Sequence, residues 1–313
     1  MSNTGKIKIL NPGLLSTIQD TGRWGYQQYG MPVAGAMDTD SMQLANWCVD
    51  NKPDTAVIET TLIGPTIEFM TDTTIALCGA LTDAQINGEP VEMNCSLSVQ
   101  SGDILEVGNA YLGCRTYLAI AGGFCIERFM NSQSTYLRGK LGGYQGRALK
   151  LGDQIPVNSS TQNLNQTIPE ELLPEFNEIT PIRIIAGTEV NCFSHQGIQA
   201  FLCSTYTISP QSDRMGYRLE GTPIEHIEGA DIISSGLTTG TIQVPGHGEP
   251  IIMMADHQTT GGYTRIAHVI TADLPLLGQM KPGDQLQFKE VSLEKAQDIL
   301  IEKHKRYQKI INV

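Results

Sequence analysis

Short runs of β-branched and apolar residues, separated by turns, recur along most of the chain. Residues 6–10 alternate lysine with isoleucine, which predicts a half-buried strand. Asn11-Pro12-Gly13 predicts a turn after it, and Asn87-Gly88 predicts a tight hairpin. Residues 115–121 are apolar enough to form a central strand. Further strands are expected at residues 56–60, 66–70, 74–78, 85–86, 104–107, 154–157, 181–185, 232–234, 241–244, 251–254, 267–271 and 285–288.

Helical periodicity is confined to a few segments. Asp38 is expected to cap a helix whose apolar residues recur at helical spacing up to Val49. A second helix is expected at residues 293–307, with Ser292 as its cap. Its buried stripe would comprise Ala296, Leu300 and Tyr307.

The polar segment 158–180 interrupts the strand pattern and is expected to link two domains, at residues 1–157 and 181–313. A Gly-Asp pair precedes an alternating strand at three places, Gly102-Asp103, Gly152-Asp153 and Gly283-Asp284. This is a weak sign of an internal repeat. The fold class expected from this pattern is mainly β: two tandem β-barrel or sandwich domains with a few short helices.

Composition argues against a nucleic-acid-binding protein, a membrane protein and a secreted protein. The chain has 313 residues, 40% of them hydrophobic, and a net charge of −12, which disfavours nucleic acid and anionic membrane surfaces as partners. No run of 18 apolar residues could span a membrane. Seven cysteines without CxxC spacing, and a start without an apolar signal segment, predict reduced thiols and a cytoplasmic location.

Several motifs for common chemistries are absent from the sequence. There is no GxxxxGK[ST] loop, no GxGxxG fingerprint, no GxSxG elbow and no HExxH, so a P-loop, a Rossmann site, an α/β-hydrolase site and a zinc site all lack support. No metal site is expected. The histidines are scattered, and His247, His257 and His268 are expected to be ordinary rather than ligating residues.

Five glycine-rich polar clusters are the candidate chemistry. The strongest, residues 256–263, follows an apolar run and combines a carboxylate, hydroxyls and two glycines, which would suit a small polar substrate. A plain polar turn after a strand explains it about equally well. The other clusters span residues 19–23, 115–123, 141–147 and 212–219. Arginines recur in them, and arginine binds carboxylate or phosphate through a bidentate fork. Asp20 and Arg23 could also form a plain surface pair.

In their order, these clusters resemble one family over nearly the whole chain. The family includes allophanate hydrolase subunit 2, biotin-dependent carboxyltransferases and the C-type subunit of 5-oxoprolinase. The matching motifs are Gln19-Asp20-x-Gly22-Arg23, Gly35-Ala36-Met37-Asp38, Ala45-Asn46, Glu59-Thr60-Thr61, Tyr117-Leu118-Ala119, Ala121-Gly122-Gly123, Ser134-Thr135, Leu141-Gly142-Gly143, Gly146-Arg147, Asp213-Arg214-Met215-Gly216, Gln243-Val244-Pro245 and Gln258-Thr259-Thr260-Gly261-Gly262-Tyr263. Thr264 departs from the family, where proline is usual.

The resemblance implies cyclophilin-like β-barrel domains and a multisubunit enzyme. Its implied activity is the ATP-dependent opening of 5-oxoproline to glutamate, together with a B-type subunit of the allophanate hydrolase subunit 1 family and an A-type subunit. ATP would act in the assembled complex, and biotin is not expected. Two alternatives stay open. One is a biotin-dependent carboxyltransferase acting on a urea-type substrate, and the other is a non-enzymatic regulator that binds a B-type kinase-inhibitor protein.

Candidate roles divide between carboxylates and substrate contacts. Candidate catalytic or orienting carboxylates are Asp20, Asp38, Glu59 and Asp256. Candidate substrate-binding residues are Gln19, Arg23, Arg115, Gly122, Gly123, Arg147, Arg214, Gln243, Thr259, Thr260, Gly261, Gly262 and Tyr263. We expect a cleft between the domains, with residues 19–23, Arg115 and Arg147 as one wall and Arg214 with residues 256–263 as the other. Because such a site would be open, replacement of Asp256 by asparagine is expected to reduce turnover with little loss of stability.

Overall fold

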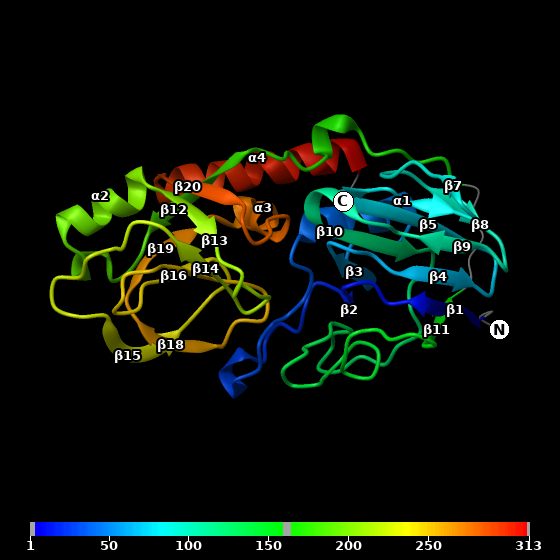
Figure 1. Cartoon of the computed structure of the whole chain (residues 1–313), viewed down its shortest axis with the longest axis horizontal. Coiled ribbons are helices and arrows are strands. Elements are labelled where there is room, and N and C mark those ends of the chain that lie inside the picture. The colour runs from blue at the N-terminus through cyan, green and yellow to red at the C-terminus, as the bar shows by residue number, and fades with distance from the viewer. Residues whose placement is uncertain (1–3, 159–163, 312–313) are drawn as a thin grey trace. The chain divides into compact units, whose positions relative to one another are not determined.

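The computed structural model describes residues 4–158 and 164–311 of the chain (Figure 1). This part of the chain is mainly β and contains four α-helices. It divides into two compact units. The first unit contains the chain up to Arg23 and from Ala34 to Pro174, and the second contains Trp24–Val33 and the chain from Glu175 onward. A short segment near the N-terminus therefore belongs with the C-terminal half.

The first unit is built from two sheets. The six-stranded sheet has the order β11-β1-β4-β9-β6-β7, and the five-stranded sheet has the order β2-β3-β10-β5-β8. The strands are β1 (Thr4–Asn11), β2 (Leu15–Gln19), β3 (Val57–Thr61), β4 (Thr66–Phe69), β5 (Thr73–Thr82), β6 (Gln85–Ile86), β7 (Glu89–Pro90), β8 (Leu97–Val99), β9 (Ile104–Glu106), β10 (Ala110–Ile120) and β11 (Gln154–Asn158).

One buried apolar cluster takes residues from both sheets. Ile7 and Ile9 of β1 are fully buried, while the lysines that alternate with them are not. Leu118 and Ile120 of β10 belong to the same cluster, and β10 pairs with β3 on one side and β5 on the other. The period-two pattern of the sequence thus places one face of each sheet in the core.

Helix α1 (Thr39–Cys48) packs on β5 and β10 in the first unit. Asp38 caps it, because its carboxylate accepts the Ser41 backbone N–H at 3.0 Å and the Ser41 hydroxyl at 2.6 Å. Met42, Ala45 and Cys48 are fully buried, which confirms the predicted apolar stripe. At Asn87-Gly88 both residues have positive φ, 53° and 84°, and join β6 to β7 as the sequence predicts.

The second unit is a closed barrel of seven strands in the order β12-β19-β16-β17-β14-β13-β20. Its core includes an aromatic group in which the Phe201 ring lies 4.5 Å from Phe288 and 6.4 Å from Tyr206, centroid to centroid. The strands are β12 (Ile179–Ala186), β13 (Thr205–Ile208), β14 (Gly216–Glu220), β16 (Thr241–Gln243), β17 (Ile251–Met253), β19 (Arg265–Val269) and β20 (Gln285–Glu290).

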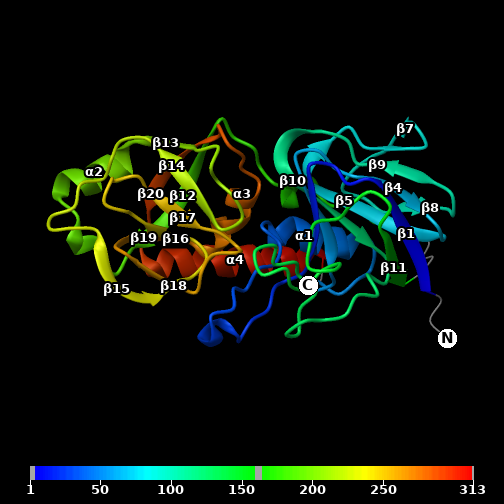
Figure 2. The same ribbon diagram turned by 60° about the horizontal axis from the view of Figure 1, so that its bottom comes forward.

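A two-stranded ribbon and three helices complete the second unit. The ribbon pairs β15 (Asp231–Gly236) with β18 (Thr260–Tyr263), which lie side by side in Figures 1 and 2. The helices are α2 (His195–Cys203), α3 (Leu274–Gly278) and α4 (Leu293–Ile311), and short 3-10 turns of this unit occur at Gln27–Tyr29, Val190–Cys192 and Thr271–Asp273. A further 3-10 turn, Glu170–Leu172, belongs to the first unit. Ser292 caps α4 through the Lys295 N–H at 3.2 Å, as predicted.

The mainly β prediction and the barrel architecture of the second unit agree with this structure. The division at residues 158–180 stays a prediction, and residues 159–163 lie outside the described residues. Within that segment Ile168 and Leu172 are buried, and the Ile168 N–H donates to Asn94 O at 2.8 Å. Among the described residues, no helix is both long and apolar enough to cross a membrane.

Candidate functional sites

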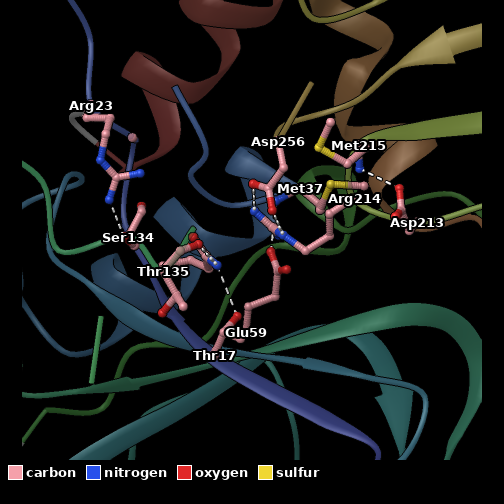
Figure 3. A network of polar contacts seen from close by, with 12 residues as sticks. Thr17, Arg23, Met37, Glu59, Ser134, Thr135, Asp213, Arg214, Met215 and Asp256 are labelled. Atoms are coloured by element: carbon pink, nitrogen blue, oxygen red, sulfur yellow. Dashed lines mark hydrogen bonds and ion pairs between the residues drawn. The ribbon is translucent and has the colours of Figure 1, made fainter. Parts of the chain in front are cut away.

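A buried ion pair in the second unit joins Arg214 and Asp256. The guanidinium donates from Nε to Oδ2 at 3.1 Å and from Nη2 to Oδ1 at 2.9 Å, as Figure 3 shows. The Asp256 N–H also donates to Arg214 O at 2.8 Å, so the backbones of the two segments are joined as well. Asp256 is only 4% exposed and Arg214 only 6%. The expectation that Asp256 lies at an open site is therefore wrong: it forms a buried bidentate ion pair.

The glycine-rich end of the cluster after Asp256, Thr260–Tyr263, forms strand β18, whereas residues 257–259 are irregular. Thr260 and Tyr263 are the exposed ends of β18, and Thr259 is half-buried. Buried Gln243 donates its amide to Tyr263 O at 3.2 Å, and a Cβ on Gly261 would lie 2.6 Å from that amide nitrogen. Gly261 therefore lets Gln243 approach the strand backbone, and β18 presents hydroxyl groups to solvent.

In the first unit, Asp20 is an acceptor for four donors. Its carboxylate accepts the Gly22 N–H at 2.8 Å, the Gln133 N–H at 2.6 Å, the Ser132 hydroxyl at 2.7 Å and the Ser134 hydroxyl. Asp20 is 4% exposed, and its own N–H donates to Ser134 Oγ at 2.9 Å. This carboxylate joins residues 20–22 to residues 132–134, which are more than a hundred positions apart.

Arg23 and Gln19 lie in the same buried region. Arg23 is fully buried and donates from Nη2 to Ser134 O, so an exposed Asp20–Arg23 pair is not what the structure contains. Gln19 donates its amide to Thr17 Oγ1 at 3.0 Å and to Thr135 O at 3.2 Å. A Cβ on Gly142 would lie 2.1 Å from Ser134 O, which explains why glycine stands there.

Glu59 lies at the centre of a second buried network in the first unit. Its Oε2 accepts the Met37 N–H at 2.8 Å and the Tyr117 hydroxyl at 2.9 Å. The Asp38 N–H donates to the same hydroxyl oxygen at 2.7 Å. Burial, followed by the charges of Glu59 and Asp38, raises the pKa of Tyr117 well above its ordinary value, so the phenol stays a donor. Arg115 Nε lies 3.9 Å from Glu59 Oε1. Glu59 thus fixes the backbone just before α1.

Three further candidates, Arg147, Gly122 and Gly123, lie in turns of the first unit. Arg147 forms a bidentate pair with Asp153, at 2.7 and 2.8 Å, and this hydrogen bond is the main reason the pKa of Asp153 is lowered. Gly122 and Gly123 have φ of 80° and 72° in a turn, where the Gly122 N–H donates to Asn51 Oδ1 at 2.8 Å. Among the described residues, no group of three or more His, Cys, Asp and Glu side chains could hold a metal ion.

The structure groups the candidates differently from the sequence. Within the first unit, Gln19, Asp20 and Arg23 belong to one network and Glu59, Arg115 and Asp38 to another, whereas Arg147 pairs elsewhere. Sequence reasoning missed Ser132, Gln133 and the hydroxyl role of Tyr117. The motif Ser134-Thr135 lies next to Ser132 and Gln133, and Tyr117 belongs to the motif Tyr117-Leu118-Ala119. Nothing local, however, marks a donor that pairs with a carboxylate 58 to 113 positions away. That residues 19–23, Arg115 and Arg147 share one cleft with Arg214 and residues 256–263 stays a prediction.

Comparison of the sequence with known proteins identifies the family of this chain. Residues 29–290 match the family model described as carboxyltransferase domain, subdomain A and B. The chain belongs to this family. It is 38% identical over 290 residues to the C-type subunit of 5-oxoprolinase from Escherichia coli and 36% identical over 296 residues to that from Haemophilus influenzae, covering 93% of both chains in each case.

A solved structure extends the comparison to a larger enzyme. The urea amidolyase of K. lactis matches with a TM-score of 0.91 and 33% identity over 96% of this chain, which corresponds to 20% of that protein. The family assignment therefore confirms the resemblance found in the sequence motifs.

Proposed function

We propose that this protein is the C-type subunit of an ATP-dependent 5-oxoprolinase. It would work with A-type and B-type subunits to open 5-oxoproline to glutamate. The observation that carries this proposal is the match to two relatives named as the C-type subunit of 5-oxoprolinase, each aligned over 93% of both chains. The aligned region therefore takes in nearly the whole of each relative.

The chemistry requires activation of an unstrained amide, which is a poor electrophile. Phosphorylation of the lactam oxygen would make the ring carbon attackable, and groups that stabilise the developing negative charge would lower the barrier. The sequence carries neither of the phosphate-binding loop motifs GxxxxGK[ST] and GxGxxG. We therefore assign ATP to the assembled complex and derive no step of this chain through it.

We infer orienting roles for the four candidate carboxylates. Asp38 caps α1, Asp20 and Glu59 accept several donors each, and Asp256 pairs with Arg214. Carboxylates held by this many donors are suited to positioning rather than to proton transfer. Exposed hydroxyls of Thr260 and Tyr263, with Thr259, are the proposed substrate contacts. Arg115, Arg147 and Arg214 remain proposed anion-binding residues, and Arg147 is the most exposed of them.

A second candidate function has one observation in its favour. The match to urea amidolyase supports a carboxyltransferase acting on a urea-type substrate, for which a biotin carrier and a biotin carboxylase would be needed. This chain corresponds to only a fifth of that protein, so those parts would have to be separate proteins. The two relatives that align over nearly their whole length therefore favour the oxoprolinase proposal.

The deciding experiment is a reconstitution. The three purified subunits are incubated with ATP and 5-oxoproline, glutamate is measured, and the assay is repeated with each subunit omitted. We expect glutamate only from the complete mixture and none from this chain alone. A parallel arm supplies biotin carboxylase, biotin carrier, bicarbonate and urea. Carboxylation of urea with no glutamate formed would replace the proposal by the second candidate function. Formation of glutamate by this chain alone would contradict the proposal that the activity needs the assembled complex.

A further inference from the structure

A cavity of about 470 Å³ lies within the second unit, and its lining includes neither Arg214 nor Asp256. Its walls include Trp24 from the N-terminal segment of that unit, Leu237 and Leu300 as apolar surfaces, and Thr238, His257 and His268 as polar groups. It is large enough for a small organic ligand. No role proposed above uses these residues.

The lining carries no formal charge. Among the residues that the structure places around this cavity there is no Asp, Glu, Lys or Arg. Burial lowers the pKa of His257 and of His268 below the ordinary value of 6.5, so both imidazoles are neutral at pH 7. The charge of Arg265, which also lowers the pKa of His268, is itself paired with Glu189. An ionised ligand would find no counter-charge here.

A hydrogen bond to the backbone determines which ring nitrogen of His257 carries the proton. Its Nδ1 lies 2.5 Å from Gln258 O, and a carbonyl only accepts, so Nδ1 carries the proton. The neutral ring then has an unprotonated Nε2, which is an acceptor. His268 Nδ1 lies 3.2 Å from Thr241 Oγ1, a hydroxyl that also contacts Thr238 Oγ1 at 3.1 Å. The cavity therefore combines an acceptor nitrogen, hydroxyl groups and apolar walls.

We propose that this cavity binds an uncharged cyclic amide through its ring N–H, with its methylene groups against the apolar walls. The amide N–H would donate to His257 Nε2, and the carbonyl would accept from a threonine hydroxyl. We expect this cavity to disfavour the anion 5-oxoproline, because the lining offers its carboxylate no counter-charge. The inference does not rest on the proposed function, because binding is measured on the whole chain without partners or turnover.

The test is an NMR titration of the full chain labelled at histidine ring carbons and at the tryptophan indole nitrogen. The probe is ε-caprolactam, and His257→Gln and His268→Gln variants assign the two histidine signals. We expect saturable shifts of both histidines and of Trp24, with N-methylcaprolactam binding about fivefold weaker because it lacks the N–H donor. 5-Oxoproline at pH 7 should leave the three signals unshifted.

A matched pair of variants tests whether the shifts arise from binding in this cavity. Ala296 lines it from α4, so Ala296→Trp should abolish the caprolactam shifts, whereas Lys305→Trp on the exposed side of the same helix should leave them intact. The proposal is overturned if caprolactam shifts none of the three signals up to its solubility limit, if N-methylcaprolactam binds as tightly, if 5-oxoproline binds as tightly, or if Ala296→Trp binds like the unchanged chain.

Discussion

Replacement of Asp256 by asparagine should destabilise the second unit strongly. The substitution removes the charge that faces Arg214 at 2.9 and 3.1 Å, while Arg214 stays 6% exposed. Loss of one partner of a buried ion pair costs roughly 3–5 kcal/mol, and because asparagine retains one acceptor we expect the lower end, about 3 kcal/mol. For a unit of this size that corresponds to a fall in melting temperature of roughly 6–12 °C.

The measurement is urea unfolding at pH 7 followed by tryptophan fluorescence and circular dichroism, together with calorimetry. Asp284→Asn is the matched control, because Asp284 pairs with Lys281 at 2.8 Å but both side chains are substantially exposed. That control should change the free energy of unfolding by less than about 1 kcal/mol. In an Arg214→Met/Asp256→Asn double variant, much of the loss should return. A single Asp256→Asn variant as stable as the Asp284→Asn control would refute the buried-pair reasoning.

Three further predictions concern single sites. Tyr263→Ala, at an exposed position of β18, should raise KM in the assembled 5-oxoprolinase without shifting the melting temperature, and an unchanged KM would remove Tyr263 from the proposed contacts. Gly143→Ala should destabilise the first unit by about 2 kcal/mol or more in urea unfolding, because φ is +54° and the new Cβ would lie 1.9 Å from Thr135 Oγ1; Gly152→Ala, also at positive φ but with open space around it, should cost only about 1 kcal/mol. Burial lowers the pKa of His257, so on acidification this histidine binds a proton in the unfolded chain before it does so in the folded chain. Its contribution to the free energy of unfolding is therefore full above pH 6.5 and decreases as the pH falls below it. A His257→Gln variant should lose less stability than the unchanged chain between about pH 7 and pH 5, and an equal loss in both proteins would contradict this.

Local patterns in the sequence predicted elements well wherever neighbours along the chain decide the structure. The Lys6–Leu10 alternation, the Asp38 cap and the Asn87-Gly88 turn are all set by residues within a few positions. Strand β18 was missed, because two glycines and two hydroxyl residues carry little strand propensity and its pairing with β15 makes it extended.

The site could be predicted only as a set of residue types. The sequence marked Asp20, Glu59, Arg214 and Asp256 as candidate site residues, and their chemical roles stay a prediction. The structure shows that all four are buried, and burial decides which groups each one contacts. Asp20 accepts hydrogen bonds from Ser132 and Ser134. Arg214 forms an ion pair with Asp256, which lies 42 positions further along the chain. Such pairings depend on which loops the sheets bring together, and no local pattern reports them. His257 and His268 likewise looked scattered, yet both line one cavity.

The path of the chain between the two units constrains how this protein can be divided. The chain leaves the first unit after Arg23, contributes Trp24–Val33 to the second, returns at Ala34 and leaves again after Pro174. A gene fragment that begins at Glu175 would therefore encode a barrel without Trp24, Gln27 and Val33, and with an incomplete cavity wall. Recombination at the single polar segment would not exchange whole modules, so the two halves are expected to be inherited together.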